Sequence, residues 1–514
     1  MLNEIREKKL WDILIIGGGA TGLGIAVDAA SRGFKTVLIE QSDFAKGTSS
    51  RSTKLVHGGV RYLKQGNVAL VTEALKERGL LCQNAPHLIS HLPFLVPNYH
   101  WWEGPFYGIG LKIYDLLAGD LGIEKSMHLS REEVLERLPT LEPKDLRGGV
   151  IYYDGQFDDA RLAIVLAQTA VDHGACVLNY MKATQFLKDN ERLIGAIALD
   201  EETQEEFEIQ AKVVINATGV FSDSVRKLDG ETESPIIEPS QGIHLVLDRS
   251  FLASDTAIMI PQTDDGRVLF FVPWLDHVLI GTTDTAVDSI LLEPKPQEEE
   301  IEFLLHHAKK YLTREPHKSD VLSVFAGLRP LVKAGDGKNT AALSRDHVIF
   351  VSDSGLVTIA GGKWTTYRKM AQDAVDQAIK VGKLNHFRCQ TEHLHLHGYA
   401  EPQHHSLSMY GTDFDQMKKE KGWDQPLHPR LSYLTACITW AVKEEMARTL
   451  EDLLARRTRA LFLNAKAALE IAPLAAHLLA KELGKPKTWE KEQLAQFISL
   501  AQNYIVFDTQ SKNL

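Results

Sequence analysis

The sequence has few cysteines and no long apolar segment. Its 514 residues include only four cysteines, which lie far apart and form no Cys-x-x-Cys pair. This excludes a disulfide scaffold and a zinc knuckle, and it predicts a reducing compartment. No apolar run reaches the roughly 18 residues that a membrane span needs, and the first residues, MLNEIREKKLWD, do not have the pattern of a secretory signal.

Basic residues are fewer than acidic residues. Lys and Arg total 57 against 68 for Asp and Glu, which gives a net charge of −11 and predicts no nucleic-acid partner. No Gly-x-Ser-x-Gly motif is present, so no serine-hydrolase triad is expected. The composition, 44% hydrophobic and 24% charged, is that of a globular protein. At roughly 150 residues per domain, the length predicts about three domains.

A dinucleotide-binding pattern occupies the N-terminal segment. Residues 12–16 (DILII) have the apolar composition of a buried strand, and they lead into GGGATG at residues 17–22. A helix and a second strand, residues 35–40, follow. In such a βαβ unit the glycines let the backbone approach a pyrophosphate, and an acid at the end of the second strand accepts from ribose hydroxyls. The pattern leaves FAD and NAD both open. The predicted contacts are Gly17, Gly19, Gly22 and Glu40.

The stretch GTSSRSTKLVHGGVRY, residues 47–62, concentrates hydroxyls, small residues and cations. Small residues allow close approach of a flat ring system, and hydroxyls and amides bind phosphate. It predicts an anion or flavin site, with a solvated loop as the alternative. GGKWTTYR, residues 361–368, ends a predicted strand and begins a helix, whose N-terminus could face an electron-rich part of a cofactor. A plain turn explains these glycines equally well.

Other polar residues have ordinary alternatives. Arg329 and Arg345 fit surface ion pairs or an anion site, and His244 alternates with apolar residues in a predicted strand, where a structural role is more usual. The connector at residues 391–405 contains His393, His395 and His397, which alternate, and then His404 and His405. Three imidazoles on one face can bind metal, but a solvated linker is favoured, and no metal site is predicted.

Taken together, these segments resemble the family of FAD-dependent, quinone-linked glycerol-3-phosphate dehydrogenases. In family order the matching motifs are IIGGGATGLGIAVDAASRG, GTSSRSTKLVHGGVRYL, FDDARL, NATGVFSD, GIHLV, FVPW, IGTTDT, GLRPL, LSRDH and AGGKWTTYRKMA, with ARRTRALFLNA in the tail. The related glycerophosphate oxidases carry a long insertion that does not occur here, which favours a dehydrogenase.

The resemblance implies an α/β fold with three parts. A glutathione-reductase-like FAD-binding domain would comprise residues 12–90, 150–240 and 325–385. A mixed-sheet α+β substrate domain would comprise residues 91–149 and 241–324, and an all-α C-terminal domain residues 390–514.

The resemblance also assigns roles to residues. Gly17, Gly19, Gly22 and Glu40 would hold the ADP half of FAD. The rest of the cofactor site would comprise Thr48, Ser49, Ser50, Lys54, Leu55, His57, Gly58, Gly59, Gly219, Gly361, Gly362 and Thr365. The substrate pocket would comprise Arg61, Tyr62, His244, Arg329, Arg345 and Lys363. His57 and His244 are both candidates for the base, and Arg329 could stabilise a developing alkoxide.

The implied reaction oxidises sn-glycerol 3-phosphate to dihydroxyacetone phosphate by hydride transfer to FAD, with electrons passed to membrane quinone. A cytoplasmic protein, peripheral on the inner face of the cell membrane, is expected, and a homodimer is among the expectations. The aromatic segment at residues 101–118 is either an interfacial surface or ordinary core. The alternatives are an oxidase that uses O₂, an amine or amino-acid oxidase, and a non-catalytic FAD-binding protein.

Overall fold

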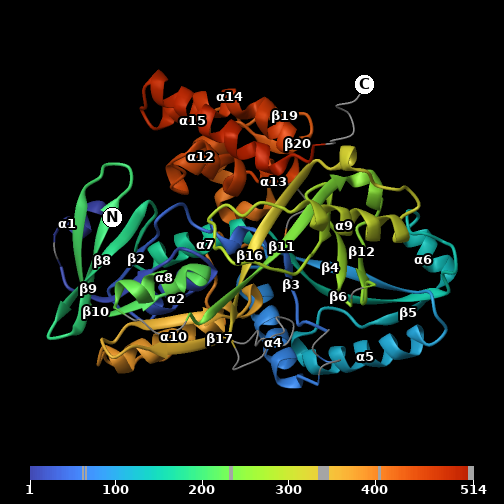
Figure 1. The fold of residues 1–514 in the computed structure, drawn as a ribbon, viewed down its shortest axis with the longest axis horizontal. Helices are drawn as coiled ribbons and strands as arrows, with labels where there is room; N and C mark the ends of the chain where they lie inside the picture. The colour runs from blue at the N-terminus through green and yellow to red at the C-terminus, as the bar shows by residue number, and fades with distance from the viewer. Residues whose placement is uncertain are drawn as a thin grey trace.

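The computed structural model arranges the chain as two β-sheets with surrounding helices and a helical C-terminal part on one side (Figure 1). It describes residues 1–7, 9–60, 63, 66–230, 235–264, 266–333, 347–402 and 407–507. Five residues named above lie outside the described residues: Arg61, Tyr62, Arg345, His404 and His405.

The first sheet is built on a parallel βαβ unit. Its strands in the described residues are β1 (Trp11–Ile16), β2 (Thr36–Ile39), β7 (Cys176–Leu178), β8 (Met181–Asp189), β9 (Arg192–Asp200), β10 (Glu206–Asn216), β17 (His347–Val351) and β18 (Val357–Gly361). β1 lies between β2 and β10 and is parallel to both. The sheet shares one apolar core with α2 (Ala20–Ser31), α7 (Asp159–Asp172) and α10 (Tyr367–Val381).

The second sheet is mixed and mostly antiparallel. Its described strands are β3 (Leu55–Val56), β4 (Ile89–Asn98), β5 (Met127–Ser130), β6 (Gly148–Phe157), β11 (Ile237–Asp248), β12 (Ala257–Ile260), β13 (Leu269–Trp274), β14 (His277–Gly281), β15 (Thr285–Ala286) and β16 (Ser323–Val332). β11 pairs with β16 from Ile237 opposite Val332 to Val246 opposite Ser323. β3 and most of β6 and β16 fall inside the segments expected for the FAD domain, yet all three pair in this sheet, so the boundary between the two parts stays a prediction.

Helices cover both faces of the second sheet. On one face pack α4 (Val68–Asn84) and α5 (Glu103–Ala118), and on the other pack α6 (Arg131–Arg137) and α9 (Glu298–Tyr311). In Figure 1, α5 lies along the lower edge of the molecule, far from the C-terminal helices at the top. Among the described residues, no helix combines the length and the apolar composition that a bilayer crossing requires.

The C-terminal part is mainly helical. Its elements include α12 (Ala436–Glu444), a π-helical turn (Asp452–Arg457), α13 (Ala460–Leu463), α14 (Ala465–Glu482) and α15 (Lys487–Ala501). A short hairpin of β19 (Pro426–His428) and β20 (Leu431–Leu434) also occurs, which the expectation of an all-helical tail missed because each strand is too short to show a period.

Candidate functional site

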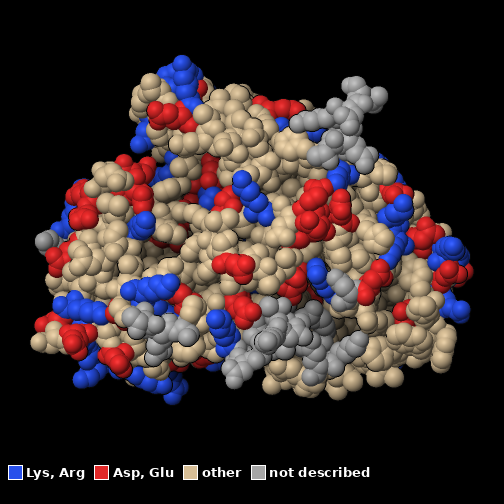
Figure 2. Space-filling model, viewed as in Figure 1, with Lys and Arg blue, Asp and Glu red and all other residues tan. Residues whose placement is uncertain are grey.

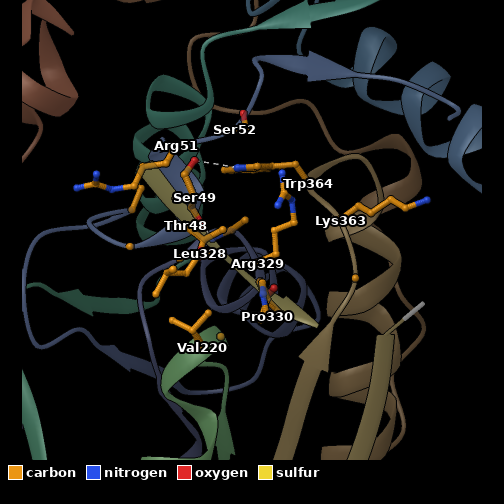
Figure 3. Close-up of a pocket in the computed structure, with 18 of the residues that line it drawn as sticks. Thr48, Ser49, Arg51, Ser52, Val220, Leu328, Arg329, Pro330, Lys363 and Trp364 are labelled. Carbon is orange, nitrogen blue, oxygen red and sulfur yellow. Dashed lines mark hydrogen bonds between the residues drawn. The ribbon is translucent and has the colours of Figure 1, made fainter. Parts of the chain in front are cut away.

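A cavity of about 1040 Å³ lies between the two sheets. Its wall is formed by the turn after β1, the loop before β3, the end of β10, the strands β11 and β16, and the segment from β18 to α10. Figure 3 shows Thr48, Ser49, Arg329 and Trp364 from these segments gathered around one space. Residues far apart in the sequence therefore converge on one site.

The turn between β1 and α2 admits only glycine at two positions. Gly17 has φ +113°, and a Cβ on Gly22 would lie 1.8 Å from the carbonyl oxygen of Gly17. A Cβ on Gly17 would lie 2.6 Å from the carbonyl oxygen of Ala217, so the turn packs directly against the end of β10. The helix N-terminus that follows faces the cavity through Gly19 and Ala20. This backbone arrangement fits the pyrophosphate of a dinucleotide.

Glu40 lies just beyond β2, beside the same turn. Its carboxylate accepts hydrogen bonds from the amides of Gly18 (2.7 Å) and Ser42 (2.9 Å), and it lines the cavity. Burial raises the pKa of Glu40, and the two amide donors oppose that rise. Each oxygen retains acceptor capacity for a ribose hydroxyl, so the position fits the predicted role.

The loop before β3 is bonded to three other segments. Ser49 Oγ accepts from the amide of Ala20 (2.9 Å), and the Ser49 carbonyl accepts from the Trp364 indole (2.9 Å), which is the dashed line in Figure 3. Thr48 Oγ1 donates to the carbonyl of Leu328 (2.6 Å). These bonds join the loop to α2, to β16 and to the start of α10, and so fix its path along the cavity wall.

Some predicted cofactor residues line the cavity and others support it. The lining includes Gly17, Gly19, Glu40, Thr48, Ser49, Leu55, His57, Gly59, Gly219, Gly361, Gly362 and Thr365. Gly22, Ser50, Lys54 and Gly58 lie behind that lining. The amide of Gly58 donates to Tyr114 Oη at 2.8 Å, which links this wall to α5.

Lys54 has a different environment from the one expected. Its side chain is fully buried, and Nζ donates to Asp159 Oδ2 (2.7 Å) and to the carbonyl of Ser50 (2.9 Å). Burial lowers the pKa of Lys54 to about 7, although the Asp159 carboxylate opposes the shift. The backbone at Lys54 has φ +65°, which directs the side chain behind the loop. Lys54 therefore does not line the cavity.

His244 lies on β11 with 3% of its surface exposed, and its ring lines the cavity. Its Nε2 is 2.9 Å from Thr53 Oγ1, and its ring stacks on Phe325 with the centroids 5.0 Å apart. Burial, and then the charges of Lys54 and Arg329, hold the pKa of His244 well below its usual value. A neutral imidazole can accept a proton.

Arg329 lies on β16 close to His244. Its Nη2 donates to the carbonyl of Thr283 (2.8 Å), and its Nη1 is 3.2 Å from Asp284 Oδ1. A Cβ on Gly242 would lie 2.3 Å from Nη2, so a larger residue there would displace the guanidinium from this position. A positive charge and a neutral imidazole are thus held in one cavity.

His57, Thr365 and Lys363 also line the cavity. The amide of His57 is 3.2 Å from Thr365 Oγ1, which joins the end of β3 to the turn after β18. In Figure 3 the side chains of Arg51 and Lys363 extend toward opposite sides of the view. Arg51 Nη2 lies 2.7 Å from Glu293 Oε2, so these two residues form an ion pair inside the protein.

The histidine-rich connector contains a structural clamp. His397 Nδ1 is 2.6 Å from Asp172 Oδ2, and its Nε2 is 3.0 Å from Asp413 Oδ2. No group of three or more His, Cys, Asp or Glu side chains suited to a metal occurs in the part of the chain that the structure describes. His397 therefore ties the connector to α7 through ion pairs.

Sequence reasoning did not assign roles to Thr53, Asp159 or Arg459. Thr53 lies inside the predicted flavin loop and Asp159 inside the FDDARL motif. The sequence therefore pointed to both segments, but it did not show which residues these two side chains contact. Asp159 accepts hydrogen bonds from Ser52 and Lys54 of that loop and from Arg459 of the C-terminal part. Only the tertiary fold identifies these partners.

Comparison with known proteins gives consistent results. The family described as FAD dependent oxidoreductase matches residues 12–368, and the C-terminal domain of alpha-glycerophosphate oxidase matches residues 356–493. The mitochondrial glycerol-3-phosphate dehydrogenase of Rattus norvegicus is 42% identical over 534 residues, covering 96% of this chain and 73% of the relative. The mitochondrial enzyme of the same name from Arabidopsis thaliana is 40% identical, covering 98% and 87%.

A solved structure agrees with these sequence matches. The glycerol-3-phosphate dehydrogenase from Bacillus halodurans, complexed with FAD, is similar with a TM-score of 0.79 and 32% identity, and 98% of each chain is covered. The predicted fold class is confirmed: an α/β FAD-binding fold with mixed sheets and a helical C-terminal domain. The prediction of FAD as the cofactor is confirmed as well.

Proposed function

The chain belongs to the family of FAD-dependent glycerol-3-phosphate dehydrogenases, and from this we propose that it oxidises sn-glycerol 3-phosphate to dihydroxyacetone phosphate in the cavity between the two sheets. The observation that supports this most directly is the juxtaposition of His244 and Arg329 beside a glycine turn suited to a dinucleotide. When bound, FAD supplies an isoalloxazine ring that accepts a hydride.

The protein's own residues would bind the cofactor and the substrate. The turn at Gly17 and the Glu40 carboxylate would hold the ADP half of the cofactor, and the loop of Thr48 and Ser49, with Gly361, would border the flavin. A dianionic phosphate needs several cations in a fixed arrangement. Arg329 and Lys363 line the cavity and would supply two of them. Arg61, Tyr62 and Arg345 stay predicted contacts.

The hydroxyl proton needs an acceptor, and of the two candidates, His57 and His244, we assign this role to His244. Burial and the neighbouring cations keep its imidazole neutral, and the ring lies in the same cavity as the Arg329 guanidinium, which would attract the substrate oxygen. Arg329 would then stabilise negative charge that develops on that oxygen. The Thr53 hydroxyl, 2.9 Å from Nε2, fixes the orientation of the ring.

The electron acceptor is proposed to be membrane quinone, reached from a bilayer surface at α5. The outer face of α5 exposes Phe106 (49%), Ile109 (64%) and Leu116 (79%), and Trp101 just before the helix is 78% exposed. This spacing gives an apolar stripe on the solvent side, as in helices that lie in a membrane interface. In Figure 2 the right part of the lower edge, where Figure 1 places α5, is almost entirely tan.

Helix α5 also contacts the wall of the cavity. Its inner residue Tyr114 accepts from the amide of Gly58, next to His57. A lipid-soluble acceptor at this face would therefore approach the flavin side of the site. Sedimentation with anionic vesicles tests the surface: the protein should bind, and Leu116→Asp should weaken binding at least several-fold. Equal vesicle binding by the wild-type protein and the Leu116→Asp variant would mean that α5 is not the membrane-binding surface. The inner face of the cell membrane, a cytoplasmic compartment and a homodimer stay predictions.

The reaction itself is tested by anaerobic absorbance. Adding sn-glycerol 3-phosphate to the purified holoenzyme should bleach the flavin band near roughly 450 nm. A band that persists at saturating substrate would contradict the proposal and would favour an amine substrate or a binding role. Reoxidation by a soluble quinone, faster than by O₂ alone, is expected of a dehydrogenase; rapid O₂ consumption without added acceptor would indicate an oxidase.

A further inference from the structure

A buried arginine of the C-terminal domain reaches the loop that borders the cavity. Arg459 is 2% exposed and precedes α13 in a left-handed conformation, with φ +54°. Its Nη2 donates to the carbonyl of Ser50 (2.7 Å) and to Asp159 Oδ1 (3.1 Å). The guanidinium carbon lies 4.2 Å from the centroid of the Phe462 ring, so the group is fixed by packing as well as by hydrogen bonds.

Asp159 connects Arg459 to the residues on both sides of Thr53 through hydrogen bonds. Its other oxygen, Oδ2, accepts from the amide (2.9 Å) and the hydroxyl (2.7 Å) of Ser52, and from Lys54 Nζ (2.7 Å). The residues before and after Thr53 are therefore bonded to one carboxylate oxygen. Because that carboxylate is fully buried, no water competes for these bonds.

Thr53 lies between these anchors, and its hydroxyl is 2.9 Å from His244 Nε2. We propose that Arg459 is a positioning residue for His244, acting through Asp159 and the loop segment of residues 52–54. The inference rests on the proposed function, in which His244 contacts the substrate. It assigns to the C-terminal domain a direct part in arranging the catalytic site.

The physical basis is the charge balance behind the loop. Asp159 is paired with Lys54 and Arg459, and Arg459 Nε is also 3.4 Å from Asp158 Oδ2. Removing the guanidinium leaves the Ser50 carbonyl with Lys54 as its remaining donor in the described contacts. The segment at residues 52–54 can then shift, and a shift on the order of 1 Å at a reacting group costs up to about 100-fold in rate.

The test compares Arg459→Met, Arg459→Lys and the control Arg448→Met as FAD-loaded proteins. Arg448 is in the same domain, but its side chain is 36% exposed and lies 3.6 Å from Glu202. The measured quantity is the anaerobic rate of flavin reduction by sn-glycerol 3-phosphate at saturation, per bound flavin. Arg459→Met should be about 10- to 100-fold slower, Arg459→Lys intermediate, and Arg448→Met unchanged. The substrate KM should change less than about threefold, because the cations of the cavity remain.

The outcomes separate positioning from simple stabilisation. A lower unfolding temperature with a wild-type rate per bound flavin in Arg459→Met would overturn the inference, since a structural role changes the yield of holoenzyme and not its rate. If Arg459→Met does not fold, Arg459→Lys decides by the same criterion. If the wild-type flavin is not reduced at all, the proposed function fails and the inference fails with it. If the wild-type flavin is reduced and the Arg459 variants reduce theirs at the same rate, only the inference is overturned.

Discussion

The two ends of helix α7 are held by different kinds of cation. At the N-terminal end, Asp159 is fully buried and pairs with Lys54 and Arg459. At the C-terminal end, Asp172 is 51% exposed and pairs with His397, which comes from the connector. Both arrangements attach distant segments to one helix, but only the first is shielded from solvent.

The helix dipole makes these two ends unequal. A carboxylate at the N-terminus is favoured by the positive end of the dipole, whereas a carboxylate at the C-terminus is disfavoured unless a cation neutralises it. Asp159 is therefore stabilised by the helix and by its partners, and Asp172 depends on His397 carrying a proton. At the buried end the Arg459 guanidinium supplies a cation near the catalytic site that stays charged, whereas the exposed end depends on the proton of His397 alone.

The largest effect is expected at the buried end. Asp159→Asn removes a charge that faces Lys54 and Arg459 and replaces one acceptor oxygen with an amide nitrogen that cannot accept from Ser52. Loss of one partner from a buried ion pair costs about 3–5 kcal/mol of unfolding free energy. The rate of flavin reduction per bound flavin should also fall about tenfold, because the support of Thr53 is lost.

Urea unfolding and stopped-flow absorbance measure the two effects. Asp415→Asn is the matched control, because its side chain is 84% exposed, and it should change stability by less than about 0.5 kcal/mol. An Asp159→Asn variant as stable as the control would mean that the buried ion pairs of Asp159 add nothing to the free energy of unfolding.

The sequence predicted the parts of the site that are local in the chain. β1, the glycine turn and Glu40 lie within one βαβ unit, so spacing alone placed them. The pattern could not say which side of the loop Lys54 faces, because that depends on a positive φ at a residue other than glycine. Lys54 was expected beside the flavin and lies behind the loop instead.

The alternation of residue types along β11 was equally unable to identify His244 as a site residue. Its neighbours Ile243 and Leu245 are in the apolar core on one face of β11, while His244 faces the cavity and is also buried. A strand covered on both faces carries no polar side that would reveal a site. The pairing of Asp159 with Arg459 joins residues 300 positions apart, and the arginines of the ARRTRA segment give no indication of which carboxylate each one meets.

A smaller effect, with a distinct pH dependence, is expected at the exposed end. The hydrogen bond to Asp413, opposed by burial and reinforced by Asp172, raises the pKa of His397 to about 9, against 6.5 for an unperturbed histidine. Because the pKa is raised on folding, the stabilisation is fully present below about 6.5 and is lost as pH rises through 9. The wild-type protein should therefore lose about 3 kcal/mol of unfolding free energy between these limits.

The variant His397→Asn isolates this contribution, because it has no proton to lose. The difference in unfolding free energy between wild type and variant should be largest at pH 6 and should shrink toward pH 10, which a series of urea titrations would measure. A difference that stays constant with pH would mean that His397 binds the two aspartates as a neutral ring. At each pH the variant should reduce its flavin at the wild-type rate, since this end of α7 does not contact the loop that carries Thr53. A parallel fall in that rate would mean that the two ends are coupled through the helix.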